Sequence, residues 1–311
     1  MDSYSTNGSQ SASTSSGHPQ HSHSPNADTS GTLPPLSLSI LGVEPLDEFI
    51  KEIADFVHHM IMVVSPGYPP GKIEVEAKVG ILKERTSERR LEMPVLVESI
   101  LQPDALDIRF ESNMSLQQHK HFNDRLNQLT SASQQSSHPA SALKYTHQIL
   151  VDSFFPLDPN SGSSDREKIR VTRDEKTGQV VECIHKIRLG DLNIFSPKQH
   201  ADWRVSVNLE VPKQHPIGTV THKRKKDRLS YSHEEFIIDL TQVASSTSAA
   251  APSQISHELE IEIARSELLK LTAARRNDMN IPEHERSAFD ELIRAFVNNA
   301  RILVRNAIDQ W

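Results

Sequence analysis

Acidic residues alternate with aliphatic residues in two stretches, one near each end of the chain. The first reads IEVEAKVG over residues 73–80, and the second reads HELEIEI over residues 257–263. In a β-strand this alternation places the acids on one face and the aliphatic residues on the other. Like charges on one face repel each other and need water, cations or a bound metal to offset them. The acids concerned are Glu74, Glu76, Glu258, Glu260 and Glu262.

Basic residues follow the same alternation in the strands predicted between these two stretches. Lys168, Arg170 and Thr172 share one parity, and Glu182, Lys186 and Arg188 share one parity in the next segment. The segment DWRVSVNLE ends at Glu210, and the segment IIDLT carries Asp239 and Thr241 on one face. In KRKKDRLSY the residues of one parity are Arg224, Lys226, Arg228 and Ser230. Almost every predicted strand therefore has one charged face.

Three segments have the periodicity of amphipathic helices. Apolar residues recur at three- and four-residue spacing over residues 45–64 and 282–308, and a further helix is predicted over residues 115–129. About eight short strands with few helices between them indicate an antiparallel sheet. Because the helices need the apolar side of that sheet, its charged side would face inward if the sheet closed. We therefore predict an α+β fold, mostly β, with a closed eight-stranded antiparallel barrel and packing helices outside.

A barrel interior that contains both carboxylates and cations suggests a polyphosphate ligand and a divalent metal. Glutamate oxygens suit Mg²⁺ or Mn²⁺, which usually retain waters and bridge to phosphate oxygens. Arg and Lys on the other walls would bind phosphates and stabilise charge that develops during phosphoryl transfer. The sequence contains no GxxxxGK[ST] phosphate loop and no evident Ser-His-Asp or Cys-His arrangement, so these two enzyme classes are not predicted.

Composition sets further bounds on the chain. Residues 1–35 are rich in Ser, His, Asn, Thr and Pro, so we expect a disordered tail before one domain over residues 36–311. The Ser/Ala-rich stretch 245–254 is predicted to be a loop. The single cysteine, Cys183, excludes an internal disulfide and fits the cytosol or nucleus. No apolar run is long enough to span a bilayer, and we expect no membrane partner.

Five motifs in order resemble the fungal-type RNA 5′-triphosphatases, the β subunit of mRNA capping enzymes, within the triphosphate tunnel metalloenzymes. They are EVE at 74–76, RxSxxLE ending at Glu210, KxRxSY beginning at Lys226, IDLT at 238–241 and ELEIE at 258–262. The resemblance covers residues 36–311. It implies an eight-stranded tunnel that removes the γ-phosphate from 5′-triphosphate ends of pre-mRNA, the first step of capping.

The resemblance also implies roles for individual residues. Glu74, Glu76 and Glu262 match the family's metal ligands, with Mg²⁺ or Mn²⁺ as cofactor. Arg170, Lys226 and Arg228 match its phosphate-binding bases, and Glu210 matches the acid that positions or deprotonates the attacking water. Lys186 matches a further basic residue of the tunnel wall. Glu258 and Glu260 match two essential acids of the last strand, and Asp239 and Thr241 match a supporting pair. Two positions depart from the family pattern. Val79 stands where the family has an aromatic residue, and Ile237 stands where it has a basic residue.

The resemblance implies a 5′-triphosphate RNA end as substrate and the nucleus as location. It also implies mRNA guanylyltransferase, the capping enzyme α subunit, as a partner, and it allows a homodimer. Two other functions stay open, a tunnel phosphatase for free triphosphate or nucleotides and a non-catalytic polyphosphate-binding subunit. The run 223–228 could also serve as a nuclear localisation signal. Its alternation favours a tunnel strand.

Overall fold

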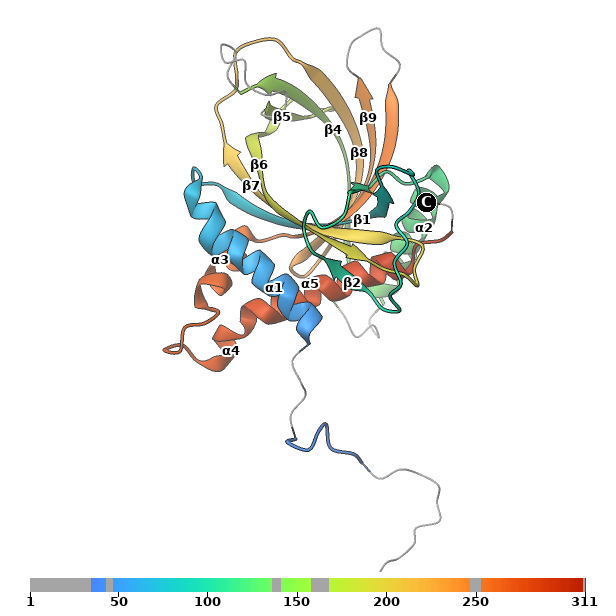
Figure 1. Cartoon of the computed structure of the whole chain (residues 1–311). Coiled ribbons are helices and arrows are strands. Elements are labelled where there is room, and N and C mark those ends of the chain that lie inside the picture. Colours follow the sequence, from blue (N-terminus) through green and yellow to red (C-terminus); the bar gives the residue numbers. More distant parts are fainter. Residues whose placement is uncertain (1–34, 43–46, 136–140, 158–167, 247–252, 310) are drawn as a thin grey trace, which may run out of the picture. The chain divides into compact units, whose positions relative to one another are not determined.

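Eight antiparallel strands form a closed barrel, viewed nearly along its axis in Figure 1. The structure is a computed structural model that describes residues 35–42, 47–135, 141–157, 168–246, 253–309 and 311. The strands follow each other around the barrel in the order β10-β9-β8-β4-β5-β6-β7-β1, and pairing of β1 with β10 closes it. The predicted fold is confirmed. The barrel strands are β1 (Lys72–Glu84), β4 (Lys144–Pro156), β5 (Lys168–Asp174), β6 (Val180–Phe195), β7 (Asp202–Pro212), β8 (His222–His233), β9 (Phe236–Ser246) and β10 (Gln254–Ile263).

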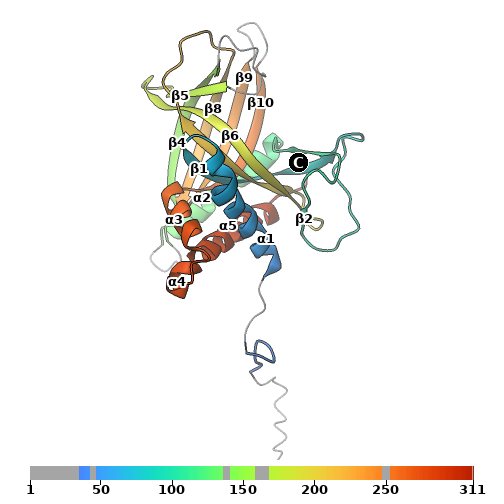
Figure 2. The ribbon, with the colours of Figure 1, turned by 60° about the vertical axis from the view of Figure 1, so that its left-hand side comes forward.

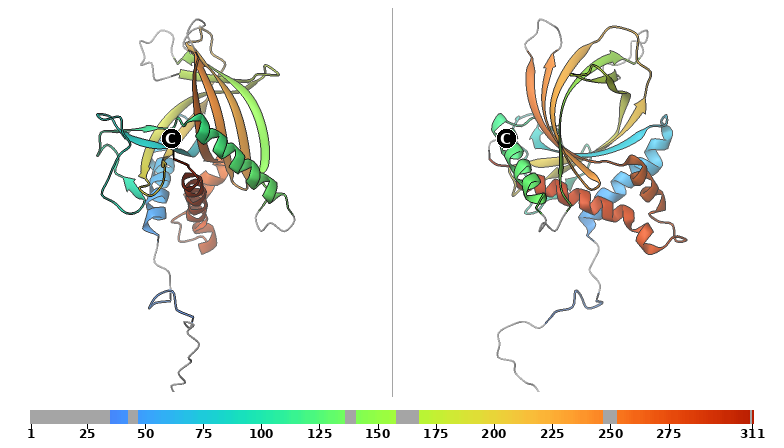
Figure 3. Two further views of the ribbon diagram at one scale, coloured as in Figure 1. Left: turned by 90° about the vertical axis from the view of Figure 1, so that its right-hand side faces the viewer. Right: turned by 180° about the vertical axis from the view of Figure 1, so that it is seen from behind.

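The outward-facing residues of part of the barrel form the hydrophobic core together with the helices. In β1, the aliphatic residues Ile73, Val75, Ala77 and Val79 are at most 1% exposed, as the sequence alternation predicts. They belong to one buried cluster with residues from the helices, including Ile53, Phe122, Leu269 and Phe296. Figures 2 and 3 show these helices gathered against the same part of the barrel. Burial of the aliphatic face therefore leaves the charged face of the same strands to line the interior.

Three of the helical regions lie close to their predicted positions, with two differences, and α3 (Ser266–Arg275) is an additional helix. The other helices are α1 (Glu48–His59), α2 (Leu116–Ser133), α4 (Glu283–Arg286) and α5 (Ala288–Arg305). After α1 the chain continues as a π-helical segment, Met60–Val64, and a short 3₁₀ turn, Ser65–Gly67. The predicted helix over 282–308 is interrupted at Ser287, which separates α4 from α5. No helix in the described ranges is long and apolar enough to cross a membrane.

Three elements were not predicted from the sequence. The short strands β2 (Ser99–Leu101) and β3 (Ile108–Glu111) pair with β6 and β1 outside the barrel ring, and α3 follows β10 directly. Part of the predicted loop 245–254 is strand, because β9 extends to Ser246 and β10 begins at Gln254, while residues 247–252 lie outside the described residues. The chain divides into the units Met1–Pro45 and Leu46–Trp311, and the second contains every barrel strand. The predicted tail, residues 1–35, lies outside the described residues except for Pro35.

Candidate active site in the barrel interior

A cavity of about 440 Å³ lies inside the barrel, and charged side chains of both signs line it. Eleven of the twelve predicted site residues line this cavity, contributed by seven of the eight strands. They are Glu74, Glu76, Arg170, Lys186, Glu210, Lys226, Arg228, Thr241, Glu258, Glu260 and Glu262. The twelfth, Asp239, is buried beside the cavity and pairs with Arg228 at 2.6 Å. The sequence alternation predicted the charged faces on which these side chains lie, and the family resemblance singled out the twelve residues.

On one wall, Glu74 and Glu76 of β1 share their partners. The Lys186 ammonium pairs with Glu74 and lies 3.6 Å from Glu76, and the Asn208 amide donates to both carboxylates at 2.9 and 3.4 Å. Burial opposes ionisation of Glu74, but Lys186 overcomes it and lowers the pKa of that carboxyl. Burial raises the pKa of Glu76. One lysine is therefore shared by two buried acids and offsets only part of their negative charge.

Glu262 of β10 pairs in register with Glu76, so a third carboxylate faces the same wall. Among the described residues the Glu262 carboxylate has no hydrogen-bond or ion-pair partner. Burial, followed by the negative charges of Asp239, Glu74 and Glu260, raises its pKa to about 8. No three acid, histidine or cysteine side chains in the described part of the chain approach closely enough to hold a metal ion. The wall nevertheless has hard oxygen donors and an excess of negative charge, which fit a divalent cation.

The neighbouring acids of β10 are held by basic residues. Lys78 lies 3.3 Å from Glu258 and 2.9 Å from Glu260, and Glu260 also accepts from Arg228 at 3.2 Å. Although burial opposes the charge on Lys78, Glu260 and its neighbours raise the pKa of this lysine well above its usual range. Ser230 donates to Asp239, which orients the carboxylate toward Arg228. These contacts fix the direction of the Arg228 guanidinium.

The opposite wall carries an excess of positive charge. Asp152 is fully buried and accepts from Lys226 at 3.0 Å, from Arg224 at 2.9 Å and from the Thr172 hydroxyl at 2.7 Å. Burial lowers the pKa of Lys226 to about 8, and the nearby charges of Arg228 and Arg170 act in the same direction, while Asp152 opposes the shift.

Several donors of this wall have no partner among the described residues. The buried Nε atoms of Arg170, Arg224 and Arg228 and the Thr241 hydroxyl make no hydrogen bond there. Buried guanidinium donors without acceptors are suited to the oxygens of an anion.

Glu210 of β7 lies between the two walls. Its carboxylate is 3.3 Å from Arg170, which also pairs with Glu182 at 2.6 Å. Burial raises the pKa of Glu210, with further contributions from Glu74 and Glu182. A carboxylate with a raised pKa, held in place by an arginine, is a candidate proton acceptor.

Among the residues of the site to which no role was assigned from the sequence are Lys78, Asp152, Glu182, Asn208 and Arg224. Four of them share the parity of assigned residues on the same strand, so the alternation had placed them on a predicted charged face without giving them a role. Asp152 had no such signal, because its strand is rich in apolar residues and carries no assigned site residue. Lys225, of the opposite parity in β8, is 51% exposed and pairs with Glu175 outside the cavity. The tunnel-strand interpretation of residues 223–228 is thus supported.

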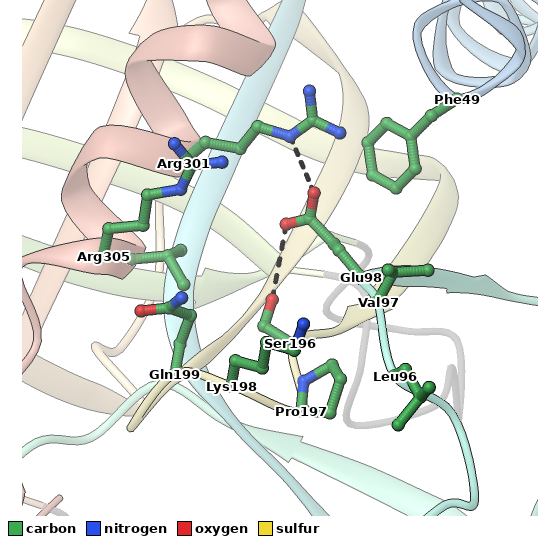
Figure 4. Close-up of a pocket in the computed structure, with 11 residues that line it drawn as sticks. Phe49, Leu96, Val97, Glu98, Ser196, Pro197, Lys198, Gln199, Arg301 and Arg305 are labelled. Atoms are coloured by element: carbon green, nitrogen blue, oxygen red, sulfur yellow. Dashed lines mark hydrogen bonds and ion pairs between the residues drawn. The ribbon is translucent and has the colours of Figure 1, made fainter.

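A second pocket lies outside the barrel, between α1, α5 and the β6–β7 turn, and Figure 4 shows the residues that line it. Glu98 is central there, and it accepts from Arg301 at 2.7 Å and from Ser196 at 3.3 Å. It also accepts from the indole of the buried Trp203 at 2.7 Å. The polar groups of this pocket therefore attach α5 to the barrel, and we assign it a structural role.

Comparison with known proteins agrees with this arrangement. A family model described as mRNA capping enzyme, beta chain, matches residues 43–309. The mRNA-capping enzyme subunit beta of Schizosaccharomyces pombe is 33% identical over 88% of this chain and 86% of the relative. The Cryptococcus neoformans subunit beta is 32% identical over 88% of this chain and 65% of the relative.

A solved structure shows the same fold. The S. pombe Pct1 RNA triphosphatase in complex with the Spt5 CTD matches 88% of this chain and 100% of that chain, with 31% identity and a TM-score of 0.76. The family predicted from the five sequence motifs is therefore confirmed, and the chain belongs to the mRNA capping enzyme beta-chain family, the family of RNA triphosphatases.

Proposed function

We propose that this protein is a metal-dependent hydrolase that removes the γ-phosphate from 5′-triphosphate ends of pre-mRNA, in the nucleus, as the first step of capping. The observation that carries this proposal is the separation of buried charge within one closed cavity. Glu74, Glu76 and Glu262 form a wall with excess negative charge, and Arg170, Lys226 and Arg228 form a facing wall with excess positive charge. A triphosphate bound together with a divalent cation would neutralise both walls at once.

Mg²⁺ or Mn²⁺ is the proposed cofactor, with Glu74, Glu76 and Glu262 as its ligands. Bound there, the cation would polarise the γ-phosphate and neutralise charge that develops on its oxygens. The donor set supports this assignment, because Glu74 and Glu76 lie on one strand and Glu262 is in register with Glu76 on the next. Three ion pairs support the strands that carry the proposed ligands. Lys186 pairs with Glu74, Glu258 pairs with Lys78, and Glu260 pairs with Arg228.

The chain's own residues supply the remaining steps. Arg170, Lys226 and Arg228 bind the phosphate oxygens, and Asp239 and Thr241 support Arg228 and the adjacent wall. Glu210 accepts a proton from water as the water oxygen bonds to the γ-phosphorus. The bond between that phosphorus and the oxygen bridging to the β-phosphate then breaks, so inorganic phosphate and a diphosphate RNA end are released.

The partners follow from the proposed place in capping. A diphosphate end is the acceptor for guanylyl transfer, so we propose the capping enzyme α subunit, mRNA guanylyltransferase, as a partner. The S. pombe relative has been solved with the Spt5 CTD, and by analogy we propose that this chain also binds an Spt5 CTD.

Release of the γ-phosphate tests this function directly. We expect the purified protein with Mg²⁺ or Mn²⁺ to release inorganic phosphate from γ-labelled triphosphate RNA, and we expect EDTA to abolish release. ATP and tripolyphosphate serve as competing substrates, and a labelled diphosphate RNA product is checked by chromatography. Hydrolysis of ATP or tripolyphosphate without hydrolysis of RNA would favour the free-triphosphate phosphatase. No release from any of them would favour the non-catalytic binding subunit.

Replacement of Glu262 separates function from stability. Glu262→Gln should abolish phosphate release because it removes a charged oxygen ligand of the proposed metal. In EDTA the variant should unfold at a temperature no lower than the wild type, because a buried carboxylate among other acids has been removed. Activity and thermal unfolding are measured on the same preparations. Glu267→Gln, whose side chain is 88% exposed on α3, is the matched control. Wild-type turnover of Glu262→Gln at saturating Mn²⁺ would contradict the metal assignment.

Replacement of Arg228 tests the phosphate-binding wall. Arg228→Ala should lower kcat by roughly a hundred- to a thousandfold, as loss of one transition-state donor does. Arg228→Lys should recover only part of this, because a lysine cannot present the planar two-donor fork to phosphate oxygens. Lys225→Ala, with its side chain outside the cavity, should retain activity. An equal loss in Lys225→Ala and Arg228→Ala would show that the site lies elsewhere.

The pH dependence should reflect Lys226. Its ammonium faces Asp152 on β4, Arg170 on β5, and Arg224 and Arg228 on its own strand. Because its pKa is about 8, Lys226 is charged below that pH and neutral above it. We expect kcat/KM for triphosphate RNA to fall above about pH 8, by at most roughly tenfold per pH unit. Lys226→Arg keeps its charge to higher pH and should flatten this limb of the profile. Identical profiles for the two proteins would exclude Lys226 as its origin.

A further inference from the structure

One end of the barrel interior differs from the central cavity, because its lining contains no carboxylate among the described residues. This pocket, of about 290 Å³, is lined by the cations Lys168, Arg170, Lys186, Arg188 and Arg224, with Asn208, Phe154 and His222. Arg170, Lys186, Arg188 and Arg224 also line the central cavity. The pocket is therefore continuous with the proposed phosphate-binding wall.

The rings of Phe154 and His222 are stacked face to face in this pocket. They are register partners on β4 and β8, their ring centroids are 4.1 Å apart, and their planes differ by 6°. The Arg224 guanidinium lies 4.9 Å from the centre of the Phe154 ring. Arg224 in turn is anchored by Asp152, so the cation and the aromatic ring are held together.

The position of Phe154 is not explained by packing of the hydrophobic core. Its neighbour Phe155 has the opposite parity and is 7% exposed in a small apolar cluster with Ile169 and Val171. Phe154 instead shares the parity of Gln148 and Leu150, which line the central cavity. Because His222 is stacked on the Phe154 ring and the Arg224 guanidinium also lies over that ring, a nucleic-acid base would stack on the imidazole that Phe154 supports.

Building on the proposed function, we propose that Phe154 and His222 form a stacking site for the base of the 5′-terminal nucleotide, and that Lys168 and Arg188 attract the phosphate that follows it. A triphosphate held by Arg170, Lys226 and Arg228 would have its nucleoside at one end of the cavity. The end without carboxylates suits the polyanionic chain that continues from that nucleoside. Because every base has a π face, this site would favour nucleoside-bearing triphosphates without selecting a sequence.

The test compares triphosphate RNA with inorganic tripolyphosphate, which has the same phosphates and no base. We expect Phe154→Ala to raise the KM for a short triphosphate RNA by roughly five- to a hundredfold, the range for loss of one stacked base. The inhibition constant of tripolyphosphate against the same reaction should stay unchanged. Phe154→Trp, which keeps a stacking surface, should retain most of the affinity. Tyr145→Ala is the control, because it removes a 46% exposed aromatic ring of the opposite parity on the same strand.

Each outcome has a distinct meaning. Equal losses of affinity for RNA and tripolyphosphate in Phe154→Ala would show that Phe154 only shapes the barrel wall, and would overturn the stacking site. An unchanged KM for RNA would overturn it as well. In both cases phosphate release by the wild type leaves the proposed function intact. Failure of the wild type to release phosphate from RNA would overturn the proposed function itself.

Discussion

Closure of the barrel is the constraint on which the rest of this structure depends. Once β1 pairs with β10, every second side chain of eight strands must point into one enclosed space. The aliphatic positions point outward, and on β1 they are covered by helices, so the charged positions have no alternative to the interior. Buried charges are costly unless they are paired and hydrogen-bonded. The network of Lys78, Glu260, Arg228 and Asp239 satisfies this requirement through consecutive ion pairs.

The charged form of a side chain is disfavoured at two places inside the barrel, one basic and one acidic. The pKa of Lys226 is lowered to about 8 and that of Glu262 is raised to about 8, in each case first by burial and then by neighbours of like charge. A fold selected only for stability would not retain both groups, because each is destabilised when charged. The arrangement makes sense if a polyanion and a cation complete it. Fixed charges of this kind are also preorganised for a transition state, since they need not reorient during the reaction.

The barrel and its charged interior could be predicted from the sequence for one physical reason, whereas the individual site residues came from the family resemblance. Alternation has a period of two, so a strand with Glu74 and Glu76 on one face must have Val75 and Ala77 on the other. Elements without periodicity were missed, including β2, β3 and α3. Asp152 was missed because its importance comes from Lys226 and Arg224 on the neighbouring strand, a contact set by barrel register. The break at Ser287 in the last helix was also not evident from its apolar stripe.

The same geometry limits what the central cavity can recognise. Its walls present guanidinium, ammonium and carboxylate groups, which under the proposed function would interact with phosphates and metal and would not distinguish one nucleoside triphosphate from another. Discrimination between an RNA end and a free triphosphate must therefore arise where the substrate leaves the central cavity. The Phe154–His222 stack and the carboxylate-free lining lie in such a place, next to cations that the central cavity also uses. Chemistry and substrate choice are thus assigned to different segments of the same strands, since β4, β5 and β8 each contribute residues to both.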